Sequence, residues 1–310
     1  MRTSNSTVGA GRRVLVTGGA GFIGARLVRR LARASDEVVV ADARAPADPE
    51  TSHVRGDLLD PVIREKAFAT GVDAVVHLAA FTSVLRSVER PDECARSNVE
   101  LTSALLELAR ERDVGTFVLA STNAVAGDHG HETITEDTPL RPRSPYGATK
   151  AAAEMLLAGY AGGYGMRTVA LRFSNVYGPG MQTKDSFVPR LMRAALAGRG
   201  VEVYGDGEQR RDLVHVDDAV DGIQLALAGS LRGPAIIASG RSVTVNELVA
   251  AARRVTGRPI PVTHVPVKAG EMPAVIVDIG RSRQRGYRPA HDLESGLATV
   301  WDDWRQPPHD

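Results

Sequence analysis

The first half of the chain alternates short runs of β-branched residues with longer helix-forming stretches. Residues 13–17, 37–42, 73–77 and 116–122 are such runs, and a helical segment such as 97–113 separates each from the next. The runs are apolar throughout, which is typical of strands that are buried on both faces. Strands that alternate with helices of this length indicate a parallel sheet covered by helices on both sides. We therefore expect an α/β fold with a doubly wound parallel sheet.

The rhythm changes in the second half. Beyond Arg172 it loosens into glycine- and proline-rich loops, within residues 175–182 and 203–212. A helix over 216–229 and a strand over 234–239 then return before a mixed C-terminal piece. This order predicts that a smaller C-terminal lobe is threaded through the sheet domain. The expected sheet domain comprises residues 1–175 and 212–238, and the expected smaller lobe comprises residues 176–211 and 239–310.

Composition excludes several function classes. The 38 Lys and Arg residues nearly cancel the 37 Asp and Glu residues, so no basic field for nucleic acid and no polybasic run for a membrane surface is expected. No apolar run reaches membrane-spanning length, and the first residues lack the apolar core of a secretory signal. The single Cys94 rules out an internal disulfide. We expect a cytoplasmic protein in which Cys94 is an inert helical residue.

A glycine-rich turn follows the first strand. Gly18, Gly21 and Gly24 would let the backbone turn tightly and approach a pyrophosphate that rests on helix-terminal N–H groups, as in Rossmann folds. Asp42 ends the next strand, where its carboxylate can accept from both hydroxyls of an adenosine ribose and would repel a 2′-phosphate. NAD is therefore favoured over NADP, although Arg44 leaves NADP open. The alternative is a structural turn beside a surface aspartate.

Later strand ends extend this cofactor hypothesis. Asp57 and Leu58 follow the next strand and are suited to bracketing an adenine. Ala79 and Ala80 are small, so a flat cofactor could pass close to the backbone there. His77 lies within an apolar strand without a carboxylate or metal partner spaced to serve it, which favours a hydrogen-bonded core histidine over a catalytic one. No metal site is expected.

The stretch "SPYGATK" contains the main catalytic candidates. Ser144 is a good N-cap and Pro145 suits the first helical position, so Tyr146 and Lys150 lie on one face of a helix. Taken alone, this pair is more typical of a packed tyrosine beside a solvated lysine. Thr122, however, ends a parallel strand just before this helix, and ligands bind beyond such strand ends. A nearby ammonium would favour the phenolate, so Tyr146 could act as a base.

The order of these pieces resembles the extended short-chain dehydrogenase/reductase family, the NAD-dependent nucleotide-sugar epimerases and dehydratases. The resemblance rests on the glycine turn, "GDLLD", "HLAA", "STNAVAG", "YGATK" and "LRFSNVYGPG", and it continues to "KAGEMPAVIVDIGRSR". It implies a tightly held NAD, a catalytic triad of Thr122, Tyr146 and Lys150, and a C-terminal lobe that grips a nucleoside diphosphate. The implied cofactor-binding residues are Gly18, Gly21, Phe22, Ile23, Gly24, Asp42, Asp57, Leu58, Leu78, Ala79, Ala80, Asn98, Tyr146 and Lys150.

The resemblance also implies a substrate site. Asn175 and Arg211 match family positions that contact the diphosphate, and Lys268 stands where the family usually has an arginine, which keeps the charge but loses the planar fork. Val203 and Tyr204 fall on the segment that lines the base. The full implied set is Thr122, Asn123, Asn175, Val203, Tyr204, Arg211, Lys268 and Glu271.

Two residues separate the possible reactions. The 4,6-dehydratases of this family carry Asp-Glu after the catalytic threonine, whereas this chain has Asn123 and Ala124, which cannot transfer those protons. Family members that act on hexuronates tend to have threonine in place of Asn175. Both features favour a nucleotide-sugar 4-epimerase of the UDP-glucose 4-epimerase group, acting on a UDP- or dTDP-hexose.

Other readings stay open. They are a UDP-glucuronate epimerase or decarboxylase, a 4-ketoreductase, and a catalytically silent NAD-binding regulatory protein. The family also suggests a homodimer that pairs through the helix around 98–110 and the helix that begins at Tyr146. The stripe of Leu101, Leu105 and Leu108 on the first of these is more typical of internal core than of an interface.

Overall fold

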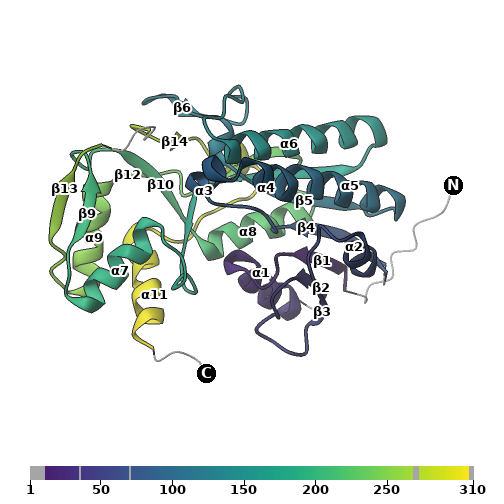
Figure 1. Ribbon diagram of the computed structural model, residues 1–310, viewed down its shortest axis with the longest axis horizontal. Helices are drawn as coiled ribbons and strands as arrows, with labels where there is room; N and C mark the ends of the chain where they lie inside the picture. Colours follow the sequence, from purple (N-terminus) through teal and green to yellow (C-terminus); the bar gives the residue numbers. More distant parts are fainter. Residues whose placement is uncertain (1–10, 35, 70, 268–271, 307–310) are drawn as a thin grey trace.

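The computed structural model describes residues 11–34, 36–69, 71–267 and 272–306. Its centre is a seven-stranded sheet in the order β11-β7-β5-β4-β1-β2-β3, in which every neighbouring pair is parallel (Figure 1). The expected doubly wound sheet is thereby confirmed. The strands are β1 (Arg13–Thr17), β2 (Glu37–Asp42), β3 (Ser52–Arg55), β4 (Ala74–His77), β5 (Thr116–Thr122), β7 (Arg167–Phe173) and β11 (Gly233–Ile237).

Two helical layers cover the sheet. The helices α1 (Phe22–Arg33) and α8 (Val216–Leu227) pack on one face, and α2 (Pro61–Phe68), α5 (Leu101–Glu111) and α6 (Pro145–Tyr164) pack on the other. The burial of strand β1 explains why residues 13–17 form a nearly continuous apolar run. Val14 and Val16 join the core beneath α1 and α8, whereas Leu15 joins the core beneath α5 and α6. Each face of the strand is therefore buried by a different layer.

The helix that leads into α5 starts earlier than its sequence pattern predicts. After α3 (Val84–Glu89), the chain runs through α4 (Pro91–Ala95) and a π-helical turn, η1 (Arg96–Glu100), directly into α5. The π-turn contains Asn98 and widens the helix by one residue at that point. Such turns are frequent at functional sites, and this one borders the cavity described below.

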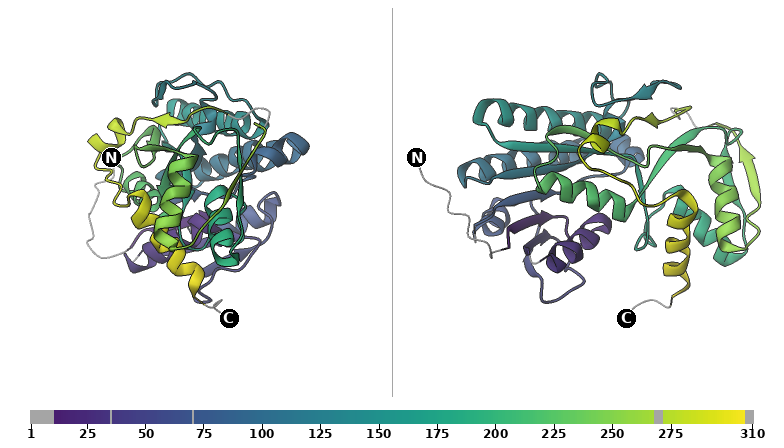
Figure 2. Two further views of the ribbon diagram at one scale, coloured as in Figure 1. Left: turned by 90° about the vertical axis from the view of Figure 1, so that its left-hand side faces the viewer. Right: turned by 180° about the vertical axis from the view of Figure 1, so that it is seen from behind.

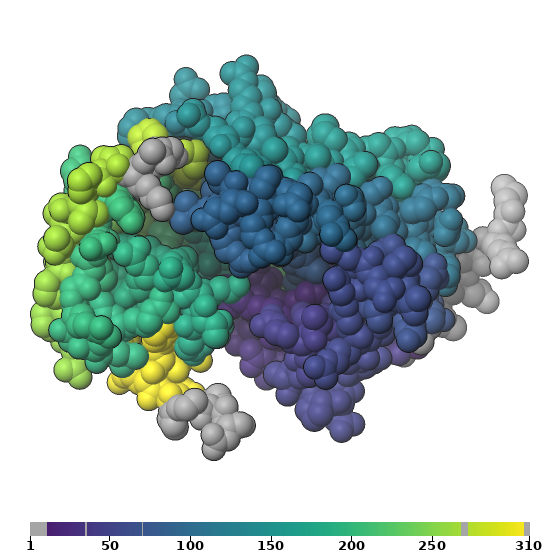
Figure 3. Space-filling view, viewed as in Figure 1, coloured from purple at the N-terminus to yellow at the C-terminus, as the bar shows by residue number. Residues whose placement is uncertain are grey.

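A smaller lobe lies at one end of the sheet (Figures 1 and 2). It contains small sheets built from β8 (Asn175–Tyr177), β10 (Arg210–His215) and β12 (Ser242–Thr244), and from β9 (Val201–Tyr204) with β13 (Val262–Val265). Its helices are α7 (Phe187–Ala197), α9 (Val245–Thr256) and α11 (Leu293–Arg305). They pack around one core, which includes Leu191 and Met192 of α7 and Trp301 of α11. The space-filling view is hollowed where this lobe faces the sheet domain (Figure 3).

Further crossings tie the lobe to the sheet domain. The short strand β6 (Thr133–Ile134) pairs with β14 (Ile276–Val277), and α10 (Gly280–Gln284) follows close behind. Helix α8 and strand β11 return to the large sheet, in keeping with the order read from the sequence, while the residue boundaries of the two parts stay a prediction. Within the described ranges, no helix is both long and apolar enough to cross a membrane.

Candidate active site

The glycine-rich turn between β1 and α1 leaves no room for side chains. Gly18 adopts φ +70°, and a Cβ there would lie 2.7 Å from the backbone nitrogen of Ala79 on the neighbouring strand end. A Cβ on Gly24 would collide with the Gly18 carbonyl oxygen. Gly21 is the N-cap of helix α1, which has no side-chain cap and no acidic residue in its first turn. Its first N–H groups are therefore free to bind an anion, as a dinucleotide pyrophosphate requires.

Asp42 lies beside this turn at the end of β2. Its Oδ2 accepts from the backbone N–H of Ala20 at 3.0 Å, and its Oδ1 accepts from that of Arg44 at 2.9 Å. The guanidinium of Arg44 donates to the Ala20 carbonyl at 3.2 Å, so it bends back toward the same turn. The carboxylate is thus fixed at the cavity wall, where it can accept from ribose hydroxyls.

One cavity of about 660 Å³ runs along the carboxyl ends of the sheet strands. The sequence-predicted residues among its lining are Gly18, Gly21, Phe22, Ile23, Gly24, Asp42, Asp57, Leu58, Leu78, Ala79, Ala80, Thr122, Tyr146 and Lys150. Sequence reasoning missed several lining residues, including Ser97 on the π-turn and Lys184, which reaches the cavity from the smaller lobe. Glycines without space for a Cβ, an open helix N-terminus and a fixed aspartate together fit NAD.

Asn98 lies behind the wall of this cavity and not in it. Its Oδ1 accepts from the backbone N–H of Phe81 at 2.9 Å, and its Nδ2 donates to the Phe81 carbonyl at 3.1 Å and to Thr149 Oγ1 at 3.0 Å. Every polar atom of the amide is therefore engaged by the protein. The residue braces the segment after β4 against helix α6, although the sequence grouped it with the cofactor ligands.

The three catalytic candidates converge at one end of the cavity. Ser144 caps α6 by accepting from the backbone N–H of Gly147 at 3.2 Å, as the sequence predicts, and this sets Tyr146 in the first turn. The side chain of Thr122 lies close enough to Tyr146 to lower the pKa of its phenol. Lys150 is almost fully buried, and its Nζ donates to the Ala120 carbonyl at 2.9 Å. Strand β5 and helix α6 thus bring a hydroxyl, a phenol and an amine together.

The protonation states of this group are set mainly by burial. Burial raises the pKa of Tyr146 to about 12, while the hydrogen bond from Thr122 acts in the opposite direction. Burial also lowers the pKa of Lys150 to about 8, against the raising effects of Cys94 and Glu154. The phenol is therefore protonated at neutral pH in the protein alone, and Lys150 is mostly charged. A positive charge brought close to the phenol would lower the pKa of Tyr146.

Two residues near the triad are structural. Nδ1 of His77 lies 2.7 Å from Thr17 Oγ1, and its Nε2 lies 3.2 Å from Thr102 Oγ1, which confirms a hydrogen-bonded core histidine. Burial, aided by the charge of Lys150, lowers the pKa of His77 to about 3, so the ring is neutral. Cys94 is buried in α4, with its sulfur 3.4 Å from Thr149 Oγ1.

The residues assigned to substrate lie mostly on the smaller lobe. Asn175 is exposed, and its Nδ2 donates to the Asp212 carbonyl at 2.9 Å. On the neighbouring strand, Nη1 of Arg211 donates to the Arg210 carbonyl at 2.8 Å. Val203 is buried in β9, while Tyr204 borders a separate pocket of about 330 Å³. Lys268 and Glu271 lie outside the described residues.

The turn after Thr122 carries the two residues that separate the reactions. Thr122 begins a short 3-10 turn, η2 (Asn123–Val125), by accepting from the backbone N–H of Ala124 at 3.2 Å. The Oδ1 atom of Asn123 lies 3.4 Å from Thr122 Oγ1, so its amide is held beside the triad hydroxyl. Neither side chain of the pair is an acid or a base.

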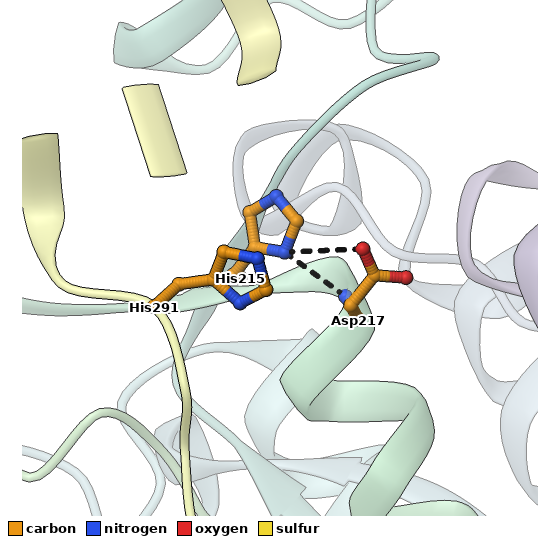
Figure 4. A group of neighbouring side chains, drawn as sticks. All are labelled: His215, Asp217 and His291. Atoms are coloured by element: carbon orange, nitrogen blue, oxygen red, sulfur yellow. Dashed lines mark hydrogen bonds and ion pairs between the residues drawn. The ribbon is translucent and has the colours of Figure 1, made fainter. Parts of the chain in front are cut away.

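A second polar cluster joins the smaller lobe to α8 (Figure 4). Nδ1 of His215 accepts from the backbone N–H of Asp217 at 3.2 Å and so caps the helix, while its Nε2 lies 3.0 Å from Thr299 Oγ1 on α11. The ring of His291 stacks on it with centroids 3.8 Å apart. Burial lowers the pKa of His215 to about 4. Because both ring nitrogens of His215 already have protein partners, we assign this cluster to helix capping and not to metal binding.

Comparisons with known proteins bear on what this cavity does. Residues 14–237 match the NAD dependent epimerase/dehydratase family. The chain is 34% identical to a UDP-glucose 4-epimerase of Streptomyces lividans, with 94% of both chains covered. It is 37% identical to a dTDP-glucose 4,6-dehydratase of Streptomyces griseus, covering 93% of this chain and 92% of that one. Among solved structures it is similar to the UDP-glucose 4-epimerase of Thermus thermophilus in complex with NAD, with a TM-score of 0.87, 34% identity, and 94% and 99% of the two chains covered.

Proposed function

Because the chain belongs to the NAD-dependent epimerase/dehydratase family, we propose that it is a nucleotide-sugar 4-epimerase that acts on a UDP-hexose. Relatives named as epimerases and as dehydratases are similarly close to it, so overall identity does not choose between the two reactions. The observation that carries the proposal is local. Thr122, Tyr146 and Lys150 meet in the cavity, and the turn beside them offers only Asn123 and Ala124.

The family is NAD-dependent, and this chain holds a cavity that fits NAD. When bound, NAD supplies an acceptor that takes a hydride from the sugar and gives it back. In the proposal, the backbone N–H groups of Phe22 and Ile23 hold the pyrophosphate, Asp42 accepts from the adenosine ribose, and Asp57 with Leu58 brackets the adenine. Leu78, Ala79 and Ala80 line the path of the cofactor toward the triad.

Tyr146 acts as the base in this proposal. Its Oη takes the proton of the sugar 4-hydroxyl and later returns it, while Thr122 Oγ1 holds the same sugar oxygen. Lys150 holds its ammonium at the Ala120 carbonyl, one helical turn from Tyr146, where it stabilises the phenolate. Lys150 is buried and Tyr146 is partly exposed in the cavity, where a bound sugar would cover it and keep the proton between the phenol and the sugar.

Asn123 and Ala124 favour epimerisation over dehydration. Elimination of water across C5 and C6 needs an acid and a base near those carbons. An amide and a methyl group can supply neither, so a 4-keto sugar formed here has no route to elimination and can only accept the hydride again. After the sugar turns over in the pocket, that return occurs on its other face.

The smaller lobe holds the nucleotide in this proposal. Asn175 and Arg211 lie on neighbouring strands and would bind the diphosphate, since β8 and β10 pair in parallel. Val203 and Tyr204 would line the base, and Lys268 and Glu271 are proposed only from their sequence positions. The lobe boundaries, residues 176–211 and 239–310, are proposed on the same grounds.

We also propose a homodimer, in which α6 contributes to the interface. Leu101, Leu105 and Leu108 are buried in the core of one chain, so the stripe they form is not available to a partner. Met155 and Tyr164, by contrast, are exposed apolar residues on α6. Light scattering at micromolar concentration should give twice the mass of the chain, and a monomer would exclude this assembly.

The function is tested with a panel of UDP- and dTDP-hexoses followed by NMR, with no nicotinamide added. We expect a UDP-hexose to be converted to its C4 epimer until the two reach equilibrium. A 4-keto-6-deoxy product would instead identify a dehydratase. A substrate that changes only when reduced nicotinamide is added would identify a ketoreductase.

A further inference from the structure

Three consecutive residues at the end of strand β5 each hold a different turn of helix α6. The Ala120 carbonyl accepts from Lys150, Thr122 lies beside Tyr146 and lowers the pKa of its phenol, and Ser121 Oγ donates to Glu154 Oε1 at 2.5 Å. The first two of these contacts involve residues of the triad. The third lies one turn beyond Lys150 and has no place in the proposed chemistry.

The carboxylate of Glu154 is an uncommon group to find in this position. Its side chain is 3% exposed, within an alanine-rich helix where a glutamate would ordinarily face solvent. Besides Ser121, it accepts from Nε of Arg172 at 3.1 Å and from Nη2 at 2.8 Å, and the Arg172 side chain is only 5% exposed. Both oxygens of the carboxylate are therefore occupied by hydrogen bonds from β5 and β7.

Arg172 extends this set of contacts beyond helix α6. Arg172 lies in β7, two residues before Ser174 and three before Asn175. Its side-chain bonds therefore anchor the strand that leads to Asn175, which is proposed to bind the diphosphate. Its Nη1 donates to the Glu136 carbonyl at 3.0 Å. The Glu136 carboxylate in turn accepts from the backbone N–H of Ile236 in β11 at 3.1 Å.

A purely structural role does not account for this arrangement well. A buried ion pair contributes little net stability compared with apolar residues of the same volume, because both charges must be desolvated. Packing alone would therefore be served equally well by two apolar side chains. What apolar residues could not supply is the bond to Ser121, next to Thr122, and a negative charge one helical turn from Lys150.

We propose that Glu154 is a positioning residue of the active site. Its hydrogen bonds to Ser121 and Arg172 keep helix α6 from sliding along strand β5. They thereby fix the positions of Tyr146 and Lys150 relative to Thr122. The negative charge of the Glu154 carboxylate also stabilises the protonated form of Lys150. This inference rests on the proposed roles of Tyr146 and Lys150, but it holds for any reaction that uses them, whether or not the substrate is a UDP-hexose.

The electrostatic part can be tested without a substrate. Cys94 on α4 and Glu154 on its own helix raise the pKa of Lys150, and Lys150 in turn lowers the pKa of His77 on β4. Tyr146 lies one turn before Lys150 on the same helix. The Glu154→Gln change removes the negative charge and leaves Arg172 uncompensated, and both effects favour loss of the Lys150 proton. The titration of Lys150 should therefore move to lower pH by about one pH unit.

Competitive acetylation with mass spectrometry measures that titration, with the exposed Lys66 as internal standard. Glu107→Gln is the matched control, because Glu107 also holds α6, through Tyr160 Oη at 2.9 Å, but lies on the surface away from the triad. It should leave Lys150 unchanged. An identical Lys150 titration in Glu154→Gln and in the parent protein would overturn the electrostatic role.

The positioning part needs a neutral change. Ser121→Ala removes only the bond to β5 and keeps the Glu154–Arg172 pair, so Lys150 should titrate as in the parent. A misplaced helix should still lower kcat by roughly tenfold while KM stays within about twofold, since small displacements of catalytic groups are costly. A Ser121→Ala protein as fast as Glu107→Gln would overturn the positioning role.

A final variant separates function from folding. Glu154 and Arg172 line a cavity of about 530 Å³ between α6, β7 and β11, so a small carboxylate can reach the site. Formate added to Glu154→Ala should restore part of the lost turnover, and chloride at the same ionic strength should not.

If the single variants do not fold, the neutral double variant Glu154→Leu with Arg172→Met should fold but have a low turnover. Parent-like turnover by that double variant would refute the proposal. If the parent protein itself converts no sugar, the Lys150 titration still decides whether Glu154 acts on the triad.

Discussion

Replacing Gly18 by alanine should damage both the stability of the protein and its hold on NAD. At φ +70°, any residue other than glycine costs about 1–2 kcal/mol. The new Cβ would also lie 2.7 Å from the nitrogen and 2.9 Å from the Cα of Ala79, so the ends of β1 and β4 must separate. Such overpacking costs typically about 1–3 kcal/mol more. We expect a loss of roughly 2–5 kcal/mol in the free energy of unfolding.

Gly71 provides the matched control. It has φ +73°, but a Cβ there would meet nothing within 4 Å. Gly71→Ala should therefore lose only the backbone part, about 1–2 kcal/mol, and bind NAD as the parent does. Gly18→Ala should weaken NAD binding by about tenfold or more, because one factor of ten corresponds to only about 1.4 kcal/mol of misfit. Urea unfolding and calorimetry with NAD measure the two effects. Equal losses in the two variants, with equal NAD affinity, would refute the idea that β1 and β4 meet too closely for a side chain.

Three further predictions concern single groups of the site. Tyr146→Phe should lower turnover by roughly two or more powers of ten, the usual scale for losing a general base, with NAD still bound, and a variant as fast as the parent would remove Tyr146 from the mechanism. Asp42→Ala should reduce the preference for NAD over NADP measured by calorimetry, whereas tighter binding of NADP to the unaltered protein would contradict the assigned role of Asp42. Because burial lowers the pKa of Lys150 to about 8 and its charge exists below that value, turnover should fall as pH rises through about 8, and a rate that stays level well above that pH would show that the charge is not needed.

Much of the fold could be read from local sequence. The apolar runs of β1, β2, β4 and β5 reflect burial on both faces, and Ser144 with Pro145 marks the start of α6 correctly. The π-turn around Asn98 could not be predicted, because a single inserted residue hardly alters the spacing of apolar positions. Its consequence for the site, an amide turned toward Phe81 and Thr149, depends on segments that are distant in sequence.

The part of the candidate site that could be predicted consists of functional groups that lie directly after a single strand in the sequence. Glycines next to β1 and a carboxylate at the end of β2 indicate a dinucleotide site by position alone. The role of Glu154 was not predictable, because a glutamate in an alanine-rich helix is normally solvated, and its partner Arg172 lies on a strand. The protonation of Tyr146 was also not predictable, since burial raises its pKa by more than the hydrogen bond from Thr122 lowers it.

The most direct test of the proposed reaction is turnover of a UDP-hexose in deuterated water without added nicotinamide. Epimerisation at C4 returns the hydride that was removed, so each enzyme molecule should interconvert many sugars, with no deuterium at any carbon and no lasting absorbance of reduced cofactor. Asn123 and Ala124 supply no group that could exchange the C5 proton. Deuterium at C5, or a requirement for stoichiometric reduced nicotinamide, would contradict the proposed 4-epimerase.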